Sequence, residues 1–136
     1  MNVNGMQITH LLLVDDDLDT LHAFRMLLEK KGYVITITQT IDQAMALAER
    51  CEFDLIITDL EFPIETGFRL LKSIRSHSDV PAIAVTAHGQ LKDRHEVFSA
   101  GFNAHVLKPV ETKELERVIT AALKGEMMIE PMSGSD

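Results

Sequence analysis

The chain has 136 residues, of which 46% are hydrophobic and 25% are charged, a composition typical of one globular domain with a single core. Its formal net charge of −8 disfavours nucleic acid as a direct partner, because phosphate binding requires a basic surface. No apolar stretch approaches the roughly 20 residues that span a bilayer, the N-terminus lacks the basic start of a signal peptide, and the single cysteine, Cys51, offers no internal disulfide. We therefore expect a cytoplasmic protein that does not bind membranes.

Five short apolar runs alternate with five amphipathic segments along the chain. The runs are rich in Val, Ile and Leu and almost continuous in hydrophobicity, which is typical of strands buried on both faces. The expected strands are His10–Val14, Tyr33–Thr38, Asp54–Thr58, Pro81–Thr86 and Ala104–Lys108. The segments between them repeat apolar residues at helical spacing. The expected helices are Leu18–Lys31, Ile41–Cys51, Thr66–Ser76, Gln90–Ala100 and Thr112–Lys124.

Strands that alternate with helices imply right-handed crossovers and a parallel sheet that is covered on both faces. We therefore expect one α/β domain over residues 9–124, with a doubly wound five-stranded sheet and five helices. Residues 125–136 drift into Pro, Ser and Gly and predict a flexible C-terminal tail. Met127, Met128 and Ile129 leave an alternative open, in which this segment continues the last helix or packs on a neighbouring surface.

Polar residues recur at the carboxyl ends of the expected strands. In chain order they are Asp15, Asp16 and Asp17 after the first strand, Asp59 after the third, Thr86 at the end of the fourth and Lys108 at the end of the fifth. Ligands of open parallel α/β sheets bind outside the carboxyl ends of the strands. We therefore expect these residues, which are far apart in the sequence, to converge on one site.

The residue types at these strand ends suit phosphoryl chemistry with a divalent cation. Closely spaced carboxylates repel each other unless a cation offsets their charge, and Mg²⁺ typically takes one or two carboxylates together with waters and phosphate oxygens. Lys108 would bring a positive charge to a phosphate oxygen, and Thr86 would donate a hydrogen bond to another. Asp59 is left as the carboxylate that can accept a phosphoryl group.

Helix capping and calcium binding account for less of the aspartate run. Asp17 or Asp19 is expected to cap the first helix, but capping explains neither three consecutive acids nor the position of Asp59. A calcium-binding loop fails because Thr20 stands where the loop needs glycine and Met26 stands where it needs glutamate. Neither the glycine-rich dinucleotide motif nor the phosphate-binding loop of nucleoside triphosphatases occurs.

Four short motifs, taken in order, resemble the receiver domain of two-component response regulators. They are LLVDDD (Leu12–Asp17), DLEFPIETG (Asp59–Gly67), VTA (Val85–Ala87) and LKP (Leu107–Pro109), and the resemblance covers residues 9–124. It implies a flavodoxin-like fold with strand order 2-1-3-4-5. It also implies a signalling domain, not an enzyme, that promotes its own phosphorylation and dephosphorylation.

The same resemblance assigns roles to the residues of the site. Asp59 is the phospho-acceptor, and a histidine kinase or a phosphotransfer protein supplies the phosphoryl group. The ligands implied for Mg²⁺ are Asp15, Asp16, Asp59 and the backbone carbonyl of Glu61. Thr86 moves toward the phosphoryl group, Lys108 pairs with it, and the peptide bond from Lys108 to Pro109 is cis.

One residue departs from the family pattern. Receivers commonly carry Tyr or Phe three residues before the lysine, where this chain has His105. Because side chains alternate along a strand, His105 is expected on the face away from Lys108, beside the fourth helix. It either slides inward with Thr86 as a switch residue, in place of the aromatic ring, or stays exposed and takes no part.

Phosphorylation is expected to change the face formed by helix 4, strand 5 and helix 5, and any homodimer is expected to form through this same face. Two alternatives to this switch stay open. The chain could be the phosphorelay receiver of a hybrid kinase, which passes its phosphoryl group to a histidine on another protein. It could also be a phosphorylation-independent binding module, although such modules can lose the acidic, Thr and Lys residues that this chain keeps.

Overall fold

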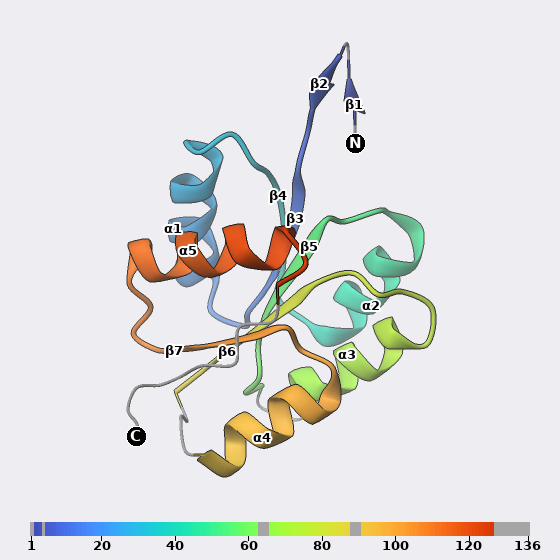
Figure 1. Ribbon diagram of the computed structural model, residues 1–136, viewed down its shortest axis with the longest axis vertical. Coiled ribbons are helices and arrows are strands. Elements are labelled where there is room, and N and C mark those ends of the chain that lie inside the picture. The colour runs from blue at the N-terminus through green and yellow to red at the C-terminus, as the bar shows by residue number, and fades with distance from the viewer. Residues whose placement is uncertain (1, 4, 63–65, 88–90, 127–136) are drawn as a thin grey trace.

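A five-stranded parallel sheet forms the centre of the computed structural model, which describes residues 2–3, 5–62, 66–87 and 91–126 (Figure 1). The strands are β3 (His10–Val14), β4 (Val34–Thr38), β5 (Leu55–Asp59), β6 (Ala82–Thr86) and β7 (Ala104–Leu107). They lie in the order β4-β3-β5-β6-β7, and all neighbouring pairs are parallel. Counted along the chain this is the order 2-1-3-4-5, so the predicted doubly wound, flavodoxin-like sheet is confirmed.

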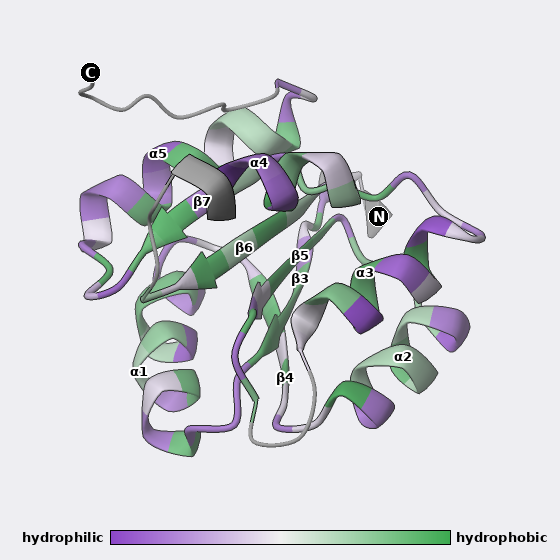
Figure 2. Cartoon of the chain, turned by 90° about the horizontal axis from the view of Figure 1, so that it is seen from below, coloured by the Kyte–Doolittle hydropathy of each residue, from purple (hydrophilic) through white to green (hydrophobic). Residues whose placement is uncertain are grey.

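Five helices cover this sheet in the part of the chain that the structure describes. They are α1 (Leu18–Glu29), α2 (Ile41–Arg50), α3 (Gly67–Arg75), α4 (Leu91–Ala100) and α5 (Thr112–Leu123). α1 and α5 pack on one face of the sheet, and α2, α3 and α4 pack on the other (Figures 1 and 2). None of these described helices is long and apolar enough to cross a membrane.

Side chains of β3 show why the strands are continuously apolar. Leu11 and Leu13 enter the core beneath α1 and α5, whereas Leu12 and Val14 enter the core beneath α2 and α3. Each of the four is at most 2% exposed. A strand that is covered on both faces needs apolar residues at every position, and Figure 2 shows the central strands as mostly hydrophobic between helices of mixed hydropathy.

The predicted element boundaries differ from the structure by one or two residues. The largest difference is at the end of α1, where Lys30 and Lys31 form a turn and not a helical continuation. That turn leads into Gly32, whose φ of +96° is readily adopted only by glycine and ends the helix. The predicted positions that fall outside the described residues are 63–65 of the DLEFPIETG motif, Gln90 at the start of the fourth predicted helix and 127–136 of the predicted tail.

The N-terminal segment adds two short strands that the sequence analysis did not predict. β1 (Asn2–Val3) and β2 (Met6–Gln7) pair in antiparallel fashion and extend away from the sheet (Figure 1). A two-residue strand is too short to show the alternation of polar and apolar residues by which strands are recognised.

Gly67 allows α3 to begin directly against the end of β5. A Cβ atom built at this position would lie 2.5 Å from the backbone oxygen of Asp59, which is closer than any side chain could approach. The Gly67 N–H donates a hydrogen bond of 3.0 Å to the carbonyl of Leu60. This close packing fixes the backbone that follows Asp59, and with it the position of the candidate site.

Candidate functional site

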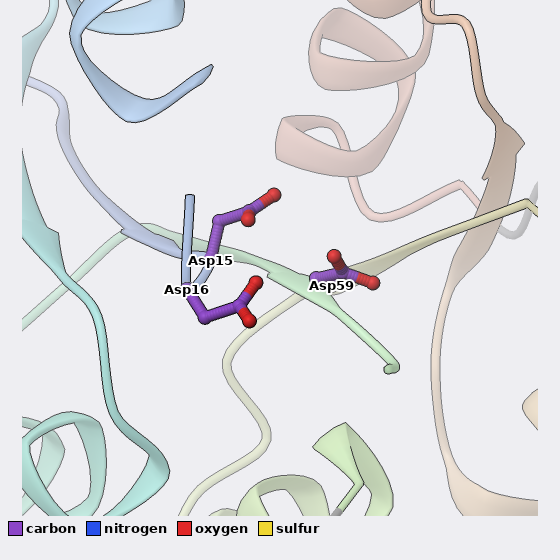
Figure 3. Close-up of side chains that lie close together, drawn as sticks. All are labelled: Asp15, Asp16 and Asp59. Carbon is purple, nitrogen blue, oxygen red and sulfur yellow. The ribbon is translucent and has the colours of Figure 1, made fainter. Parts of the chain in front are cut away.

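Three aspartates meet at the carboxyl end of the sheet, as the sequence analysis predicted. Asp15 follows β3, Asp16 lies in the loop before α1, and Asp59 is the last residue of β5. Carboxylate oxygens of the three lie within 4.8 Å of one another, and their side chains point toward a common centre (Figure 3). Asp15 is 6% exposed and Asp59 is 4% exposed, whereas Asp16 is exposed to solvent. The centre between them is therefore open on the side of Asp16.

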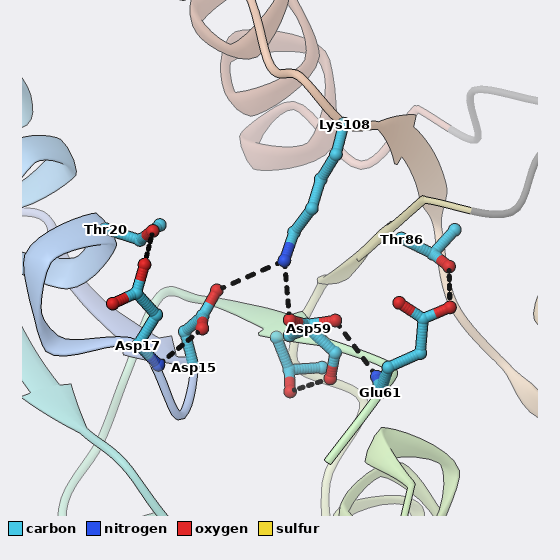
Figure 4. A network of polar contacts seen from close by, with 8 residues as sticks. Asp15, Asp17, Thr20, Asp59, Glu61, Thr86 and Lys108 are labelled. Atoms are coloured by element: carbon cyan, nitrogen blue, oxygen red, sulfur yellow. Dashed lines mark hydrogen bonds and ion pairs between the residues drawn. The ribbon is translucent and has the colours of Figure 1, made fainter. Parts of the chain in front are cut away.

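Lys108 supplies positive charge to this cluster from the end of β7. Its Nζ lies 2.7 Å from Oδ2 of Asp59 and 3.7 Å from Oδ2 of Asp15 (Figure 4). The backbone N–H of Lys108 donates to the carbonyl of Thr86, at 2.9 Å, so this lysine is tied to the end of β6. The peptide bond from Lys108 to Pro109 is cis, as the family resemblance implied.

Backbone groups orient the two buried carboxylates. The N–H of Asp17 donates to Oδ1 of Asp15 at 2.8 Å, and the N–H of Glu61 donates to Oδ1 of Asp59 at 2.9 Å. In each case the donor is two residues further along the chain, so each loop holds its own carboxylate in place. Both carboxylates consequently keep one oxygen, Oδ2, on the side of Lys108.

Burial and neighbouring charges shift the pKa values of Asp15 and Lys108. Burial raises the pKa of Asp15 above its usual value, and the charges of Asp59 and Asp16 add to the increase, while the N–H of Asp17 and the charge of Lys108 only partly oppose it. Burial lowers the pKa of Lys108, but the hydrogen bond to Asp59 and the nearby carboxylate charges outweigh burial and raise it. Three carboxylates against one ammonium leave an excess of negative charge.

Thr86 is also part of the site, at the end of β6. Its side chain is 2% exposed, and its hydroxyl donates a hydrogen bond of 3.0 Å to Oε2 of Glu61 (Figure 4). The sequence analysis assigned only the backbone carbonyl of Glu61 to the site. The structure therefore adds a fourth carboxylate, that of the Glu61 side chain, to the surroundings of Asp59.

Gln39 is a second contributor that the sequence analysis missed. It directly follows β4, and its side-chain amide donates a hydrogen bond of 3.2 Å to the backbone carbonyl of Asp16. The signal that identified the other residues, a polar side chain at the carboxyl end of a strand, applies to Gln39 as well. This contact restrains the loop that carries the exposed aspartate.

Asp17 has a different position from its two neighbours. Of the two proposed capping residues, Asp17 and not Asp19 occupies the N-cap position of α1, but its side chain makes no capping hydrogen bond to the helix backbone. Its Oδ2 accepts a hydrogen bond of 2.6 Å from the hydroxyl of Thr20. This hydrogen bond lowers the pKa of Asp17. The aspartate run therefore divides into two residues at the cluster and one at the helix start.

His105 lies where the alternation of β7 predicted. Its register partner on β6 is Ala84, which belongs to the core with Val97 of α4, whereas Val106 faces the core beneath α1 and α5. His105 therefore shares a face of the sheet with α4. Its exposed fraction is 9%, so the alternative in which this side chain is exposed is wrong.

Comparison with known proteins agrees with this geometry. A model of the response regulator receiver domain matches residues 11–120. The chain is 36% identical over 112 residues to an uncharacterized 14.6 kDa protein in the sodA1 3′ region of Leptolyngbya boryana, with 80% of this chain and 86% of that protein covered. It is 32% identical over 116 residues to the transcriptional regulatory protein ResD of Bacillus subtilis, with 85% of this chain and 48% of ResD covered. The chain thus spans about half the length of ResD and of several other relatives.

Solved structures show the same fold. The chain is similar to a response regulator receiver domain protein (CheY-like) from Methanospirillum hungatei JF-1, with a TM-score of 0.81, 28% identity and coverage of 88% of this chain and 96% of that one. It is also similar to a response regulator receiver domain protein from Clostridium thermocellum, with a TM-score of 0.79, 25% identity and coverage of 87% and 96%. Because the family model matches most of the chain and the strand order agrees, the chain belongs to the response regulator receiver domain family of two-component signalling.

Proposed function

We propose that this receiver domain accepts a phosphoryl group on Asp59 from a histidine kinase or a phosphotransfer protein. The observation that carries the proposal is the surroundings of the Asp59 carboxylate, which is buried, lies within 4.8 Å of two further carboxylates and contacts Lys108 at 2.7 Å. Massing buried carboxylates is unfavourable for the fold alone. The negative charge of these carboxylates would bind a cation, and the positive charge of Lys108 would bind a phosphoryl oxygen.

The residues present fit Mg²⁺. Asp15, Asp16 and Asp59 provide closely spaced carboxylate oxygens, which are the ligands that hard divalent cations prefer. We assign the backbone carbonyl of Glu61 as a further ligand on the family resemblance. When bound, the ion would neutralise charge that develops on the transferring phosphoryl group.

The chain itself needs to supply only a nucleophile and hydrogen-bond donors. An oxygen of Asp59 forms a bond to phosphorus while the bond from phosphorus to the donor's imidazole nitrogen breaks, and the electron pair of that bond stays on the nitrogen. Lys108 then pairs with one phosphoryl oxygen and the Thr86 hydroxyl donates to another. Hydrolysis by water later breaks the bond between phosphorus and Asp59, which regenerates the carboxylate and releases inorganic phosphate.

The proposed output is a change in the face formed by α4, β7 and α5. Thr86 ends β6 next to β7, and Lys108 directly follows β7, so groups that contact the phosphoryl group are continuous with this face. Leu107 is 50% exposed there and offers apolar surface for a partner protein or for a second copy of this chain.

We place the receiver domain at residues 9–124 and a flexible tail at residues 125–136. The cytoplasmic location stays a prediction from the sequence.

Acetyl phosphate, a small phosphodonor, tests the proposal without the cognate kinase. The wild type should gain one phosphoryl group by intact-mass spectrometry when Mg²⁺ is present, and the gain should disappear with a chelator. Asp59→Asn should gain none, because an amide cannot accept the phosphoryl group. Modification that persists in Asp59→Asn would show that the acceptor is another residue.

Phosphoryl transfer onward separates a switch from a relay. A relay receiver would return its phosphoryl group to the histidine of a phosphotransfer protein, whereas a switch would lose it to water. Absence of any phosphorylation on Asp59 would favour the third candidate, a phosphorylation-independent binding module. The intact set of Asp59, Thr86 and Lys108, brought together at one end of the sheet, favours a phosphorylated domain over such a module.

A further inference from the structure

The side chain of Glu61 connects the phospho-acceptor to Thr86. Its backbone N–H holds Oδ1 of Asp59 at 2.9 Å, while its carboxylate accepts the Thr86 hydroxyl at 3.0 Å (Figure 4). The charge of Glu61 also contributes to the raised pKa of Lys108. One residue is thus in contact with Asp59 and Thr86 and acts electrostatically on Lys108.

We propose that the Glu61 carboxylate is a latch that holds the Thr86 hydroxyl in the resting state and thereby opposes phosphorylation of Asp59. This inference rests on the function proposed above and adds a positioning residue to it. A phosphoryl group on Asp59 needs the same hydroxyl as a donor. Thr86 has one O–H to give, so it must leave Glu61 before it can stabilise the phosphoryl group.

Burial makes the exchange of partners unfavourable. Thr86 is 2% exposed, so water has little access to replace the carboxylate during the exchange. The hydrogen bond from Thr86 to the Glu61 carboxylate is charge-assisted, so its loss offsets part of what the new hydrogen bond to the phosphoryl group contributes. Once Thr86 has moved, the released Glu61 carboxylate lies beside an anionic phosphoryl group, and like charges at close range repel. Both effects lower the population of the phosphorylated state.

The latch can be removed without disturbing the backbone around it. Glu61 makes an isolated antiparallel bridge with Thr66, and its N–H bond to Asp59 also comes from the main chain. Glu61→Ala keeps both contacts and loses only the carboxylate. Glu61→Gln loses the charge but keeps a side-chain oxygen that can accept from Thr86.

Binding of fluoroberyllate, a phosphoryl mimic, at saturating Mg²⁺ measures the effect. Fluorine NMR would give the apparent affinity of wild type, Glu61→Gln and Glu61→Ala, with Glu52→Ala as a control because Glu52 is exposed and changes net charge equally. We expect Glu61→Ala to bind roughly tenfold more tightly than wild type, as loss of one charge-assisted hydrogen bond implies. Glu61→Gln should lie between them and Glu52→Ala should match wild type. Equal or weaker binding by Glu61→Ala overturns the latch.

A double-mutant cycle shows whether Glu61 acts through Thr86. Thr86→Val removes the hydroxyl at nearly constant shape, so the gain from Glu61→Ala should fall below about threefold in that background. The same gain in both backgrounds would mean that Glu61 acts by charge alone and would overturn the latch.

A ligand-free measurement separates this inference from the proposed function. In the absence of Mg²⁺ and fluoroberyllate, the methyl signal of Thr86 should report one rotamer in wild type and averaging over rotamers in Glu61→Ala. If the wild type does not bind fluoroberyllate, the proposed function fails, and the methyl comparison still decides the latch. Identical methyl signals in the two proteins would overturn it.

Discussion

The Nζ atom of Lys108 lies 2.7 Å from Oδ2 of Asp59, although the two residues are 49 positions apart in the sequence. Lys108 is also bound through its N–H to the carbonyl of Thr86. The lysine therefore connects Asp59 to the ends of two strands. This arrangement suits a residue that transmits the presence of a phosphoryl group more than one that performs the transfer.

Lys108→Ala should separate acceptance from transmission. Acetyl phosphate should still modify Asp59, because positioning and charge neutralisation by Mg²⁺ provide most of the catalysis. The amide chemical shifts of residues 91–100, in α4, should respond much less to phosphorylation than in wild type. Lys124→Ala, at an exposed position after α5, is the matched control and should respond as wild type does. A full α4 response in Lys108→Ala would remove Lys108 from the transmission route.

Mg²⁺ should stabilise the folded chain through the acidic cluster. A ligand that binds only the folded state adds about 1.4 kcal/mol to the free energy of unfolding when its concentration is tenfold above Kd. Urea unfolding with and without Mg²⁺ should show this gain in wild type and lose most of it in Asp16→Asn or Asp59→Asn. Asp79→Asn, an exposed substitution at the other end of β6, should keep the gain. Retention of the full gain in Asp16→Asn would place the ion elsewhere.

The raised pKa of Asp15 predicts a pH dependence of stability in the absence of Mg²⁺. Because the folded state binds this proton more tightly than the unfolded state, whose pKa is about 3.8, the stabilising contribution is complete below 3.8 and is lost as pH rises through the higher folded-state pKa. Wild type should therefore lose stability relative to Asp15→Asn as pH rises through this window, measured by urea unfolding at a series of pH values.

Asp17→Asn provides a comparison with the opposite sign. The folded-state pKa of Asp17 is lowered, chiefly by the Thr20 hydroxyl, so its contribution is present above 3.8 and is lost as pH falls through the folded-state value. Relative to Asp17→Asn, wild type should gain stability as pH rises. If the stability of wild type changed with pH in the same direction relative to Asp15→Asn and relative to Asp17→Asn, the opposite pKa shifts assigned to the two aspartates would be contradicted.

Most of the fold and the members of the acidic cluster could be predicted because they follow from regular features of the sequence. Continuous apolar runs such as that of β3 indicate a doubly covered parallel sheet. The ends of parallel strands lie at one edge, so Asp15 and Asp59 could be brought together without coordinates. The contact between Lys108 and Asp59 agrees with the same argument.

Side-chain partners outside the regular elements could not be predicted in this way. The hydrogen bond from Thr86 to Glu61 depends on the rotamer of a loop residue, and no periodic pattern reports a rotamer. The same holds for Arg75, at the end of α3, whose partners lie near 78–80 and 101–103. Such contacts depend on how the helices pack, which follows from the whole fold and not from local sequence.

Arg75 should be the most sensitive of the exposed and half-buried cations to substitution. Its guanidinium donates to the carbonyls of Val80 at 2.7 Å, Gly101 at 2.9 Å and Ser78 at 3.2 Å, and to Oδ1 of Asn103 at 3.3 Å. It therefore fastens the end of α3 to the loop between α4 and β7. Arg75→Met removes the guanidinium donor from the three half-buried carbonyls, whereas Oδ1 of Asn103 keeps its hydrogen bond from the Ala82 N–H.

We expect Arg75→Met to lower the free energy of unfolding by about 2–4 kcal/mol, since several hydrogen bonds to one charged group are lost together. Arg75→Lys should retain only part of the free energy of unfolding that Arg75→Met loses, because an ammonium group cannot reach all the acceptors that a planar guanidinium reaches. Arg50→Met, in the last turn of α2 and exposed, should change stability by less than about 0.5 kcal/mol. Equal effects of Arg75→Met and Arg50→Met in urea unfolding would refute the role given to Arg75.

His105 should make the response of α4 to phosphorylation depend on pH. The side chain is 9% exposed on the face of β7 that packs toward α4, so it points inward. A neutral imidazole is compatible with this position, whereas a protonated one resists burial because burying a charge is unfavourable. Histidine is the side chain whose ordinary pKa lies closest to neutral pH, so acidification is the direct way to test whether a charge at this position matters.

The comparison with His105→Phe isolates this residue from the other titratable groups. The sequence of α4 itself carries Lys92, Asp93, Arg94, His95 and Glu96, and the substitution leaves all five in place, so their contribution to any pH effect is common to both proteins. The change in amide chemical shift that fluoroberyllate binding causes in residues 91–100 should become smaller from neutral to acidic pH in wild type. In His105→Phe this change should vary much less with pH. The phenylalanine fills the same buried position without a charge to acquire, so the fold should persist in both. A pH dependence that is the same in the two proteins would show that His105 is only a core residue and that the switch of this receiver does not pass through it.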